Sequence, residues 1–166
     1  MWWFRRKFLY KASLFIALAF AGCTLEPLYQ SESKTADFLQ NIQLDKPKDR
    51  DSYVLYNRLS ERLHGAQGTQ YLLSIKPRKS EARAGIAADG RAQRKIVTGF
   101  ADYRIVQTAD AKELQTGSVK AFTGYSQSGS NVAILAASNN AYDRLMIQLA
   151  DKILDTLILT QPQTKP

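Results

Sequence analysis

The chain has 166 residues, of which 45% are hydrophobic and 23% charged, and a formal net charge of +8 at pH 7. Such a length and composition are typical of one folded domain with a real core. The single cysteine excludes a fold that is stabilised by internal disulfides.

The N-terminal segment has the pattern of an export signal. A basic lead from Arg5 to Lys11 precedes an uncharged apolar run, Ala12–Phe20, and then the small residues Ala21 and Gly22. The apolar run is short, because a membrane-spanning helix needs about 20 such residues. We therefore predict a signal peptide over residues 1–22 rather than a transmembrane anchor.

The only cysteine, Cys23, directly follows this segment. The residues from Leu18 to Cys23, LAFAGC, resemble a bacterial lipobox, with Phe20 where leucine is usual. That resemblance implies a covalent lipid on the Cys23 thiol and cleavage before it. The alternative is a free cysteine beside an ordinary signal peptide. Thr24 resembles the residue found after the cysteine in outer-membrane lipoproteins, which implies a lipid-anchored protein facing the periplasm.

The mature chain would start at Cys23 and have one domain. Removing the four basic residues of the signal leaves 19 basic and 15 acidic residues, a net charge of +4. The high overall charge is therefore partly a property of the signal, and export argues against a nucleic-acid partner. We expect a lipidated tether over 23–36, a single α/β sandwich domain over 37–160 and a flexible tail over 161–166.

A strand and a helix are expected first in this domain. The apolar residues within Phe38–Leu44 predict the strand, and the polar turn KPKDRDS follows. Asp51 or Ser52 is expected to cap the helix, and Gly65 to end it. The apolar stripe of this helix recurs every fourth residue, at Leu55, Leu59 and Leu63.

Three strands joined by local connections are expected next, over Tyr71–Lys76, Gln93–Gln107 and Leu114–Tyr125. Consecutive strands with short connections predict an antiparallel meander, and Gly99 indicates a bulge in the second of them. This strand would place Val97, Ala101, Tyr103 and Ile105 on one face and Ile96, Phe100 and Val106 on the other. The second face either contacts a partner or is ordinary exposed apolar surface.

A long helix over about Val132–Leu159 would complete the domain, capped by Ser130 or Asn131. Its stripe is formed by Tyr142, Leu145, Leu149, Ile153 and Leu157, with Met146 beside it. Two amphipathic helices can bury their stripes on one face of a small sheet. The predicted fold class is α+β, with two helices packed on one face of a mainly antiparallel four-stranded sheet.

The opening CTLEPLY of the mature chain and the order of its elements resemble the LPS-assembly lipoproteins of Gram-negative bacteria (the LptE family). The family opening is Cys-Gly-Phe-x-Pro-Leu-Tyr, from which this chain departs at Thr24 and Leu25. The resemblance continues through the Tyr71-Leu72-Leu73 strand and Ala141-Tyr142. It implies an outer-membrane lipoprotein that plugs the β-barrel LPS translocon, assists its assembly and helps to deliver lipopolysaccharide. The partners would be the β-barrel LPS-assembly protein and lipopolysaccharide.

A basic segment, Lys76–Lys95, is the candidate contact for either partner. Its local charge of +5 exceeds the +4 of the whole mature chain. We expect a cationic hairpin connection whose arginines bind lipid phosphates or barrel carboxylates, or which merely stays solvated. Charge reversal at Arg91, Arg94 and Lys95 should weaken LPS binding and preserve the fold. The candidate contacts are Arg78, Lys79, Arg83, Arg91, Arg94 and Lys95.

Catalytic motifs are not evident, so we expect a protein that is not an enzyme. There is no Ser-His-Asp set, no zinc-ligand spacing around the single histidine, His64, and no glycine loop for phosphate. No cofactor is expected other than the covalent lipid on Cys23, and no metal. The alternative functions are an auxiliary lipoprotein of an ABC-type lipid transport system and, with no motif in its favour, a peptidoglycan-binding lipoprotein.

Overall fold

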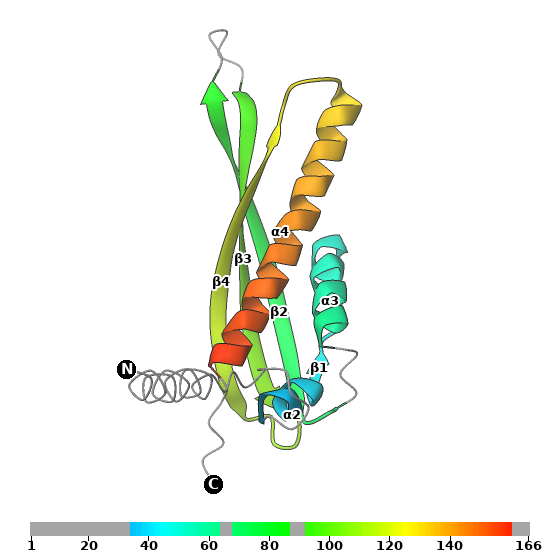
Figure 1. Ribbon diagram of the computed structural model, residues 1–166, viewed down its shortest axis with the longest axis vertical. Helices are drawn as coiled ribbons and strands as arrows, with labels where there is room; N and C mark the ends of the chain where they lie inside the picture. The colour runs from blue at the N-terminus through cyan, green and yellow to red at the C-terminus, as the bar shows by residue number, and fades with distance from the viewer. Residues whose placement is uncertain (1–33, 64–67, 87–91, 161–166) are drawn as a thin grey trace, which may run out of the picture.

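Three helices and four strands are described, in residues 34–63, 68–86 and 92–160 of the computed structural model (Figure 1). The predicted signal peptide, Cys23, Gly65 and the predicted tail lie outside these residues. The elements in chain order are α2 (Lys34–Gln40), β1 (Ile42–Leu44), α3 (Arg50–Arg62), β2 (Tyr71–Ile86), β3 (Ala92–Gln107), β4 (Glu113–Ser126) and α4 (Asn131–Leu159).

One mixed sheet contains all four strands, in the order β1-β2-β3-β4. The antiparallel meander of β2, β3 and β4 is confirmed, and β1 lies parallel to β2 with Ile42 opposite Tyr71. A parallel pair requires a crossover connection, which α3 supplies. Helices α3 and α4 lie side by side on one face of the sheet (Figure 1), so the predicted α+β class is confirmed.

The prediction of a strand over Phe38–Leu44 is correct only for its last three residues. Helix α2 occupies Lys34–Gln40, including residues 34–36, which were assigned to the tether. The physical reason is a helical period that the strand interpretation overlooked: Thr35 and Leu39 are four residues apart and both are buried.

Helix α3 begins two residues earlier than expected. The cap is Asp49, not Asp51 or Ser52, and its carboxylate accepts from the Ser52 amide at 2.8 Å. The Ser52 hydroxyl accepts from the Asp49 amide at 3.0 Å, which completes a reciprocal capping box. The hydrogen bonds that the Ser52 amide, and then the Ser52 hydroxyl, donate to the Asp49 carboxylate hold the pKa of Asp49 below its ordinary value. The helix ends at Arg62, with Leu63 as its C-terminal cap.

The core lies between α4, α3 and the helix-facing side of the sheet. Both predicted helix stripes are confirmed, and Ser130 is the N-cap of α4. The predicted face of β3 is also confirmed as buried. Each such aliphatic side chain contributes about 1.5–3 kcal/mol when fully buried. The fully or almost fully buried residues include Leu55, Leu59, Val97, Ala101, Ile105, Leu145, Met146, Leu149, Ile153 and Leu157.

Gly99 is not at a bulge, contrary to the prediction. It is regularly paired with Lys79 on β2 and Ala121 on β4. A methyl group at this position would lie 2.9 Å from Leu145 and 3.0 Å from Leu149. Glycine is therefore needed here because α4 approaches the strand closely.

Two ion pairs join the outer sides of α3 and α4. Arg50 donates to Asp143 at 3.1 Å, and Arg58 donates to Asp151 through Nε at 2.9 Å and Nη2 at 3.2 Å. Both pairs have a sequence separation of 93, so the helices run in the same direction and in a constant register. None of the helices in the described part of the chain is long and apolar enough to span a membrane.

Candidate ligand-contacting surface

The basic segment is mostly strand rather than the loop that we predicted. β2 continues to Ile86 and β3 begins at Ala92, and their pairing is regular from Tyr71↔Gln107 to Ala84↔Arg94. The sequence does not predict this part of the strand, because charged side chains and Pro77 replace the alternation of apolar and polar residues that is typical of a strand. The hairpin therefore holds its basic side chains in fixed directions, and alternate residues lie on opposite faces.

This alternation separates the candidate contacts into two groups. Lys79, Arg83 and Lys95 lie on the side of the helices, in line with buried Val97, whereas Arg78 and Arg94 lie on the open side. Arg91 lies outside the described residues. The six candidates therefore do not form one cluster, and each side has its own electrostatic surroundings.

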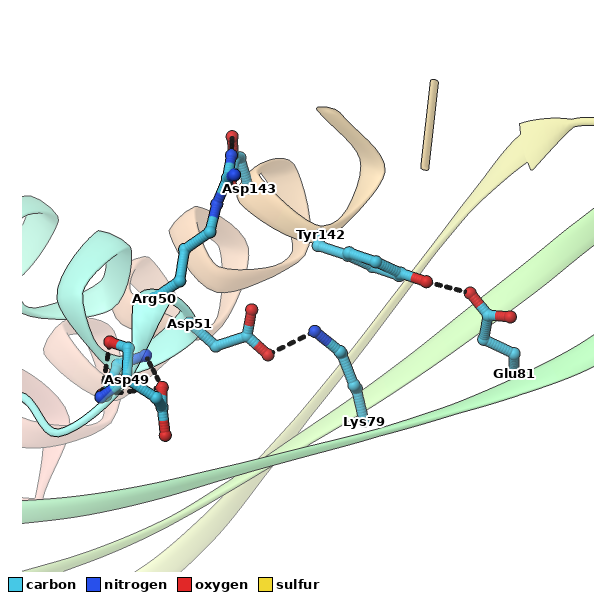
Figure 2. A network of polar contacts seen from close by, with 8 residues as sticks. Asp49, Arg50, Asp51, Lys79, Glu81, Tyr142 and Asp143 are labelled. Atoms are coloured by element: carbon cyan, nitrogen blue, oxygen red, sulfur yellow. Dashed lines mark hydrogen bonds and ion pairs between the residues drawn. The ribbon is translucent and has the colours of Figure 1, made fainter. Parts of the chain in front are cut away.

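On the helix side, Lys79 is bound to the N-terminal turn of α3 and to α4. Its ammonium lies 2.5 Å from the Asp51 carboxylate and 4.0 Å from the centre of the Tyr142 ring. Figure 2 shows the ion pair between Lys79 and Asp51. The Lys79 ammonium is therefore bound within the protein by an ion pair and by a cation–π contact. Lys79 thus joins the hairpin to both long helices.

Glu81 is the centre of a second set of contacts on the same side. One carboxylate oxygen accepts from the hydroxyls of Tyr125 at 3.1 Å and Tyr142 at 2.5 Å, and the other from the Lys95 ammonium at 2.9 Å. The contact with Tyr142 is drawn in Figure 2. Neither Lys79 nor Lys95 is therefore a free cation, which the charge pattern alone did not indicate.

The protonation equilibria of this network follow from these contacts. Partial burial alone would raise the pKa of Glu81, but the hydrogen bonds from Lys95, Tyr142 and Tyr125 outweigh it and lower the pKa. The hydrogen bond to Glu81 raises the pKa of Lys95, and it is also the largest cause of a strongly raised pKa of Tyr142. At neutral pH the network holds the Glu81 carboxylate, the Lys95 ammonium and a neutral Tyr142.

The open side of the sheet combines aromatic and cationic side chains. Arg78 donates to Asp102 at 2.7 Å and lies 6.0 Å from the Phe100 ring centre, and the Lys120 ammonium lies 5.4 Å from that centre. A hydrogen bond from Ser118, and then Arg78, lowers the pKa of Asp102. Neighbouring Phe122 is 72% exposed. The prediction of a partly apolar second face agrees with this arrangement.

Lys120 and Phe122 were not among the predicted site residues. The sequence contained the relevant signal, since Val119, Ala121 and Tyr125 alternate with these two in the strand. We name this surface the open face and use the term below for the exposed side chains Lys76, Arg78, Arg94, Ile96, Lys120 and Phe122 together with half-buried Phe100. Chemically it suits an anionic amphiphile, because cations surround exposed aromatic and aliphatic groups.

Metal chemistry has no support from the described ranges. In residues 34–63, 68–86 and 92–160, no group of three or more histidine, cysteine, aspartate or glutamate side chains could hold a metal ion. His64 and Cys23 are not in these ranges.

Comparison with known proteins gives likeness at the level of structure. No protein-family model matches the chain, and no curated protein matches it. A candidate lipoprotein from Caulobacter crescentus is 22% identical, with a TM-score of 0.63, and the match covers 81% of this chain and 99% of that one.

Two further solved lipoproteins have the same fold. Rare lipoprotein B from Shewanella oneidensis is 15% identical, with a TM-score of 0.56 and coverage of 73% and 94% of the two chains. A minor lipoprotein from Acinetobacter baumannii is 14% identical, with a TM-score of 0.52 and coverage of 75% and 94%. At these identities the likeness establishes the fold, which this chain shares with bacterial lipoproteins.

Proposed function

We propose that the protein is an outer-membrane lipoprotein that plugs the β-barrel LPS translocon, assists its assembly and helps to deliver lipopolysaccharide to the cell surface. The observation that carries this proposal is the fold shared with rare lipoprotein B over 94% of that chain, taken together with the resemblance of the CTLEPLY opening to the LPS-assembly lipoproteins. The lipobox-like LAFAGC before Thr24 supplies the anchor, and the open face supplies a surface for an anionic amphiphile.

In this proposal the covalent lipid on Cys23 holds the domain at the periplasmic side of the outer membrane. One acyl chain binds a bilayer only marginally, whereas two or more hold a protein firmly, at about 0.8 kcal/mol per buried methylene. Arg78 and Arg94 then bind lipid phosphates on the open face, since a guanidinium offers two parallel hydrogen bonds to phosphate. Lys79 and Lys95 instead stabilise the hairpin through Asp51 and Glu81.

The first test concerns the anchor. Mass spectrometry of the membrane-extracted full chain is expected to find a mature N-terminus at Cys23 that carries acyl chains. In the matched control, Cys23→Ser, the protein is expected in the soluble periplasmic fraction. A mature protein that keeps Met1, or that has an unmodified Cys23, would contradict the proposal.

The second test concerns the partner. A detergent extract is expected to yield the chain together with the β-barrel LPS-assembly protein, and depletion of the chain is expected to reduce surface LPS. Recovery with an inner-membrane permease instead would favour an auxiliary lipoprotein of an ABC-type lipid transport system.

A further inference from the structure

The outer edge of β4 is unpaired along the strand. β4 is the last strand of the sheet, and in the described part of the chain no strand lies beyond it (Figure 1). Such an edge offers a row of free backbone donors and acceptors to another extended chain.

The register identifies the groups that point outward. β3 and β4 are paired with Ile105 opposite Gln115 and Val97 opposite Thr123, and the Gln127 amide donates to the Gln93 carbonyl at 2.9 Å. From Gln115 to Tyr125, odd-numbered residues of β4 therefore direct their backbone groups to β3, and even-numbered ones direct theirs outward. The Gly124 carbonyl agrees, because it accepts from Arg144 on α4 at 3.3 Å. The outward N–H and C=O groups are those of Thr116, Ser118, Lys120 and Phe122.

The opposite edge of the sheet, along β2, is less suited to strand addition than β4. On β2, residues Tyr71–Leu73 are paired with β1. Farther along, no described strand pairs with the outer side of β2, but Pro77 has no N–H and charged side chains such as Lys76, Lys79 and Glu81 recur along the strand, a composition that disfavours pairing with another chain. Beyond Glu113, β4 has no proline and a single charged residue, Lys120. A strand of this kind is the usual site of strand addition.

The charges around this edge select the kind of segment that fits. Arg144 lies at Gly124, and Arg94 Nε lies 3.4 Å from the position of a Cβ on the same glycine. Lys120 is the third cation. The only carboxylate on the strand, Glu113, lies at its far end and is bound to Arg104 at 2.7 Å. Exposed Phe122 can cover an apolar side chain of an added strand.

We propose that the β4 edge receives an extended, acidic segment of the barrel partner, which pairs with it as an additional strand. This inference rests on the proposed function, because it names how that partner is bound. Main-chain hydrogen bonds to the even-numbered residues would give affinity, and the three cations would select carboxylates.

The first experiment removes one outward N–H and nothing from the existing ladder. In Ser118→Pro the proline ring replaces the N–H that points away from β3. Proline also restricts the backbone conformation of the residue before it, and Gly117 tolerates that restriction. Ser118→Ala is the matched control, since it also lacks the hydroxyl but keeps the N–H. Recovery of the full-length barrel with the Ser118→Pro chain is expected to fall by about tenfold, a loss of about 1.4 kcal/mol. Ser118→Ala is expected to recover the barrel as the unchanged chain does.

The second measurement does not depend on a variant. Amide hydrogen exchange of the full chain, alone and with the barrel, is expected to slow on complex formation at Thr116, Ser118, Lys120 and Phe122. The odd-numbered amides from Gln115 to Tyr125 are expected to be protected in both states, because they already pair with β3. This alternation is specific to strand addition.

The remaining outcomes each overturn the inference in a distinguishable way. Equal recovery of the barrel by all three chains, without new protection, would leave the proposed function standing and reject the edge. Failure of the unchanged chain to recover any barrel would reject the proposed function and this inference together. Protection of the even-numbered amides in the free chain, with a doubled mass in sedimentation, would assign the edge to a second copy.

Discussion

Glu81 determines much of the local order in the hairpin, because three side chains from β3, β4 and α4 converge on its carboxylate. A hydrogen bond to a charged group contributes about 1.5–3 kcal/mol, roughly twice a neutral one. The network also explains why the charge count overestimated the number of free cations. A basic residue in a sequence is available to a ligand only if the fold leaves its charge accessible. Lys95 is largely covered where it binds Glu81, whereas Arg78 keeps most of its side chain exposed although it also binds Asp102.

The stability conferred by Glu81 should depend on pH. Its pKa in the folded state is depressed below the unfolded value of 4.5, so its contribution is fully present above pH 4.5 and is lost as the pH falls through the folded value. We expect Glu81→Gln to reduce the free energy of unfolding by about 1–2 kcal/mol at neutral pH. Urea denaturation over a pH series should show this difference shrinking in acid.

The control for that prediction is Glu61→Gln, in which the replaced side chain is 74% exposed and bound only to Arg58. An exposed pair of this type is worth about 0–1 kcal/mol, so the control should show little pH dependence. A Glu81→Gln deficit that persists unchanged in acid would show that packing, not charge, explains the effect.

At the scale of elements, the contact between β3 and α4 depends on Gly99, where a methyl group would overlap Leu145. Gly99→Ala is expected to lower the free energy of unfolding by about 1–3 kcal/mol through overpacking. Ser80→Ala, on the open and exposed side of β2, is the control and should change stability by less than about 0.5 kcal/mol. Urea denaturation measures both.

A double-mutant cycle makes the cause specific. Leu145→Ala alone should cost about 2–5 kcal/mol by leaving a cavity. The double variant should cost less than the sum, because the methyl group at position 99 then occupies part of the space that Leu145 leaves. Strict additivity would mean that the strand and helix do not compete for space here.

The elements that were predicted correctly are those in which the regular spacing of apolar residues indicates which face is buried. Leu145, Leu149 and Ile153 indicated α4, and the alternation at Val97 and Ala101 identified the buried side of β3. The far half of β2 could not be found in this way, because Lys79 and Glu81 lie on its helix side, where an apolar residue would be expected. There the strand is held by ion pairs and ladder hydrogen bonds, which leave no hydrophobic period.

The capping of α3 was misplaced for a related reason. Asp49, Asp51 and Ser52 are all chemically able to cap, and only the path of the chain decides among them. In the structure Asp51 is instead the partner of Lys79. The site could not be predicted for the same reason, since the pairing of Arg78, Lys79 and Lys95 with carboxylates distant in the sequence depends on tertiary structure. The two open-side candidates could have been selected only by knowing which face the helices cover.

At the scale of the molecule, charge on the open face is expected to matter more for LPS binding than total charge. We predict that the double variant Arg78→Glu, Arg94→Glu weakens binding of purified LPS by about tenfold, with an effect that decreases at high salt. The control Arg62→Glu, Lys152→Glu changes the net charge equally, at exposed positions of α3 and α4. Equal affinities for the two variants would contradict a specific surface.

This pair replaces the reversal of Arg91, Arg94 and Lys95 that the sequence suggested. Lys95 donates to Glu81 within the largely covered network that joins the hairpin to α4, so its reversal would place two carboxylates together there and disturb the hairpin. Arg78 also binds a carboxylate, Asp102, but both side chains are exposed, and solvent screens the repulsion that Arg78→Glu creates. A loss of LPS binding in that triple variant would then have two explanations. Thermal melting of the Arg78→Glu, Arg94→Glu variant within a few degrees of the unchanged chain would exclude unfolding as the cause.

The paired ion bridges between α3 and α4 have a mechanical consequence. Displacing α3 by one turn would bring Arg50 opposite Ile147 and break the bridge to Asp143. Exposed bridges contribute only about 1 kcal/mol each, but together with the interlocked leucines they oppose sliding between the two long helices. Both helices should therefore move as a single rigid block when a partner pulls on the protein. Bending would then be concentrated in the part of the β2–β3 hairpin that extends beyond the N-terminal end of α3 (Figure 1).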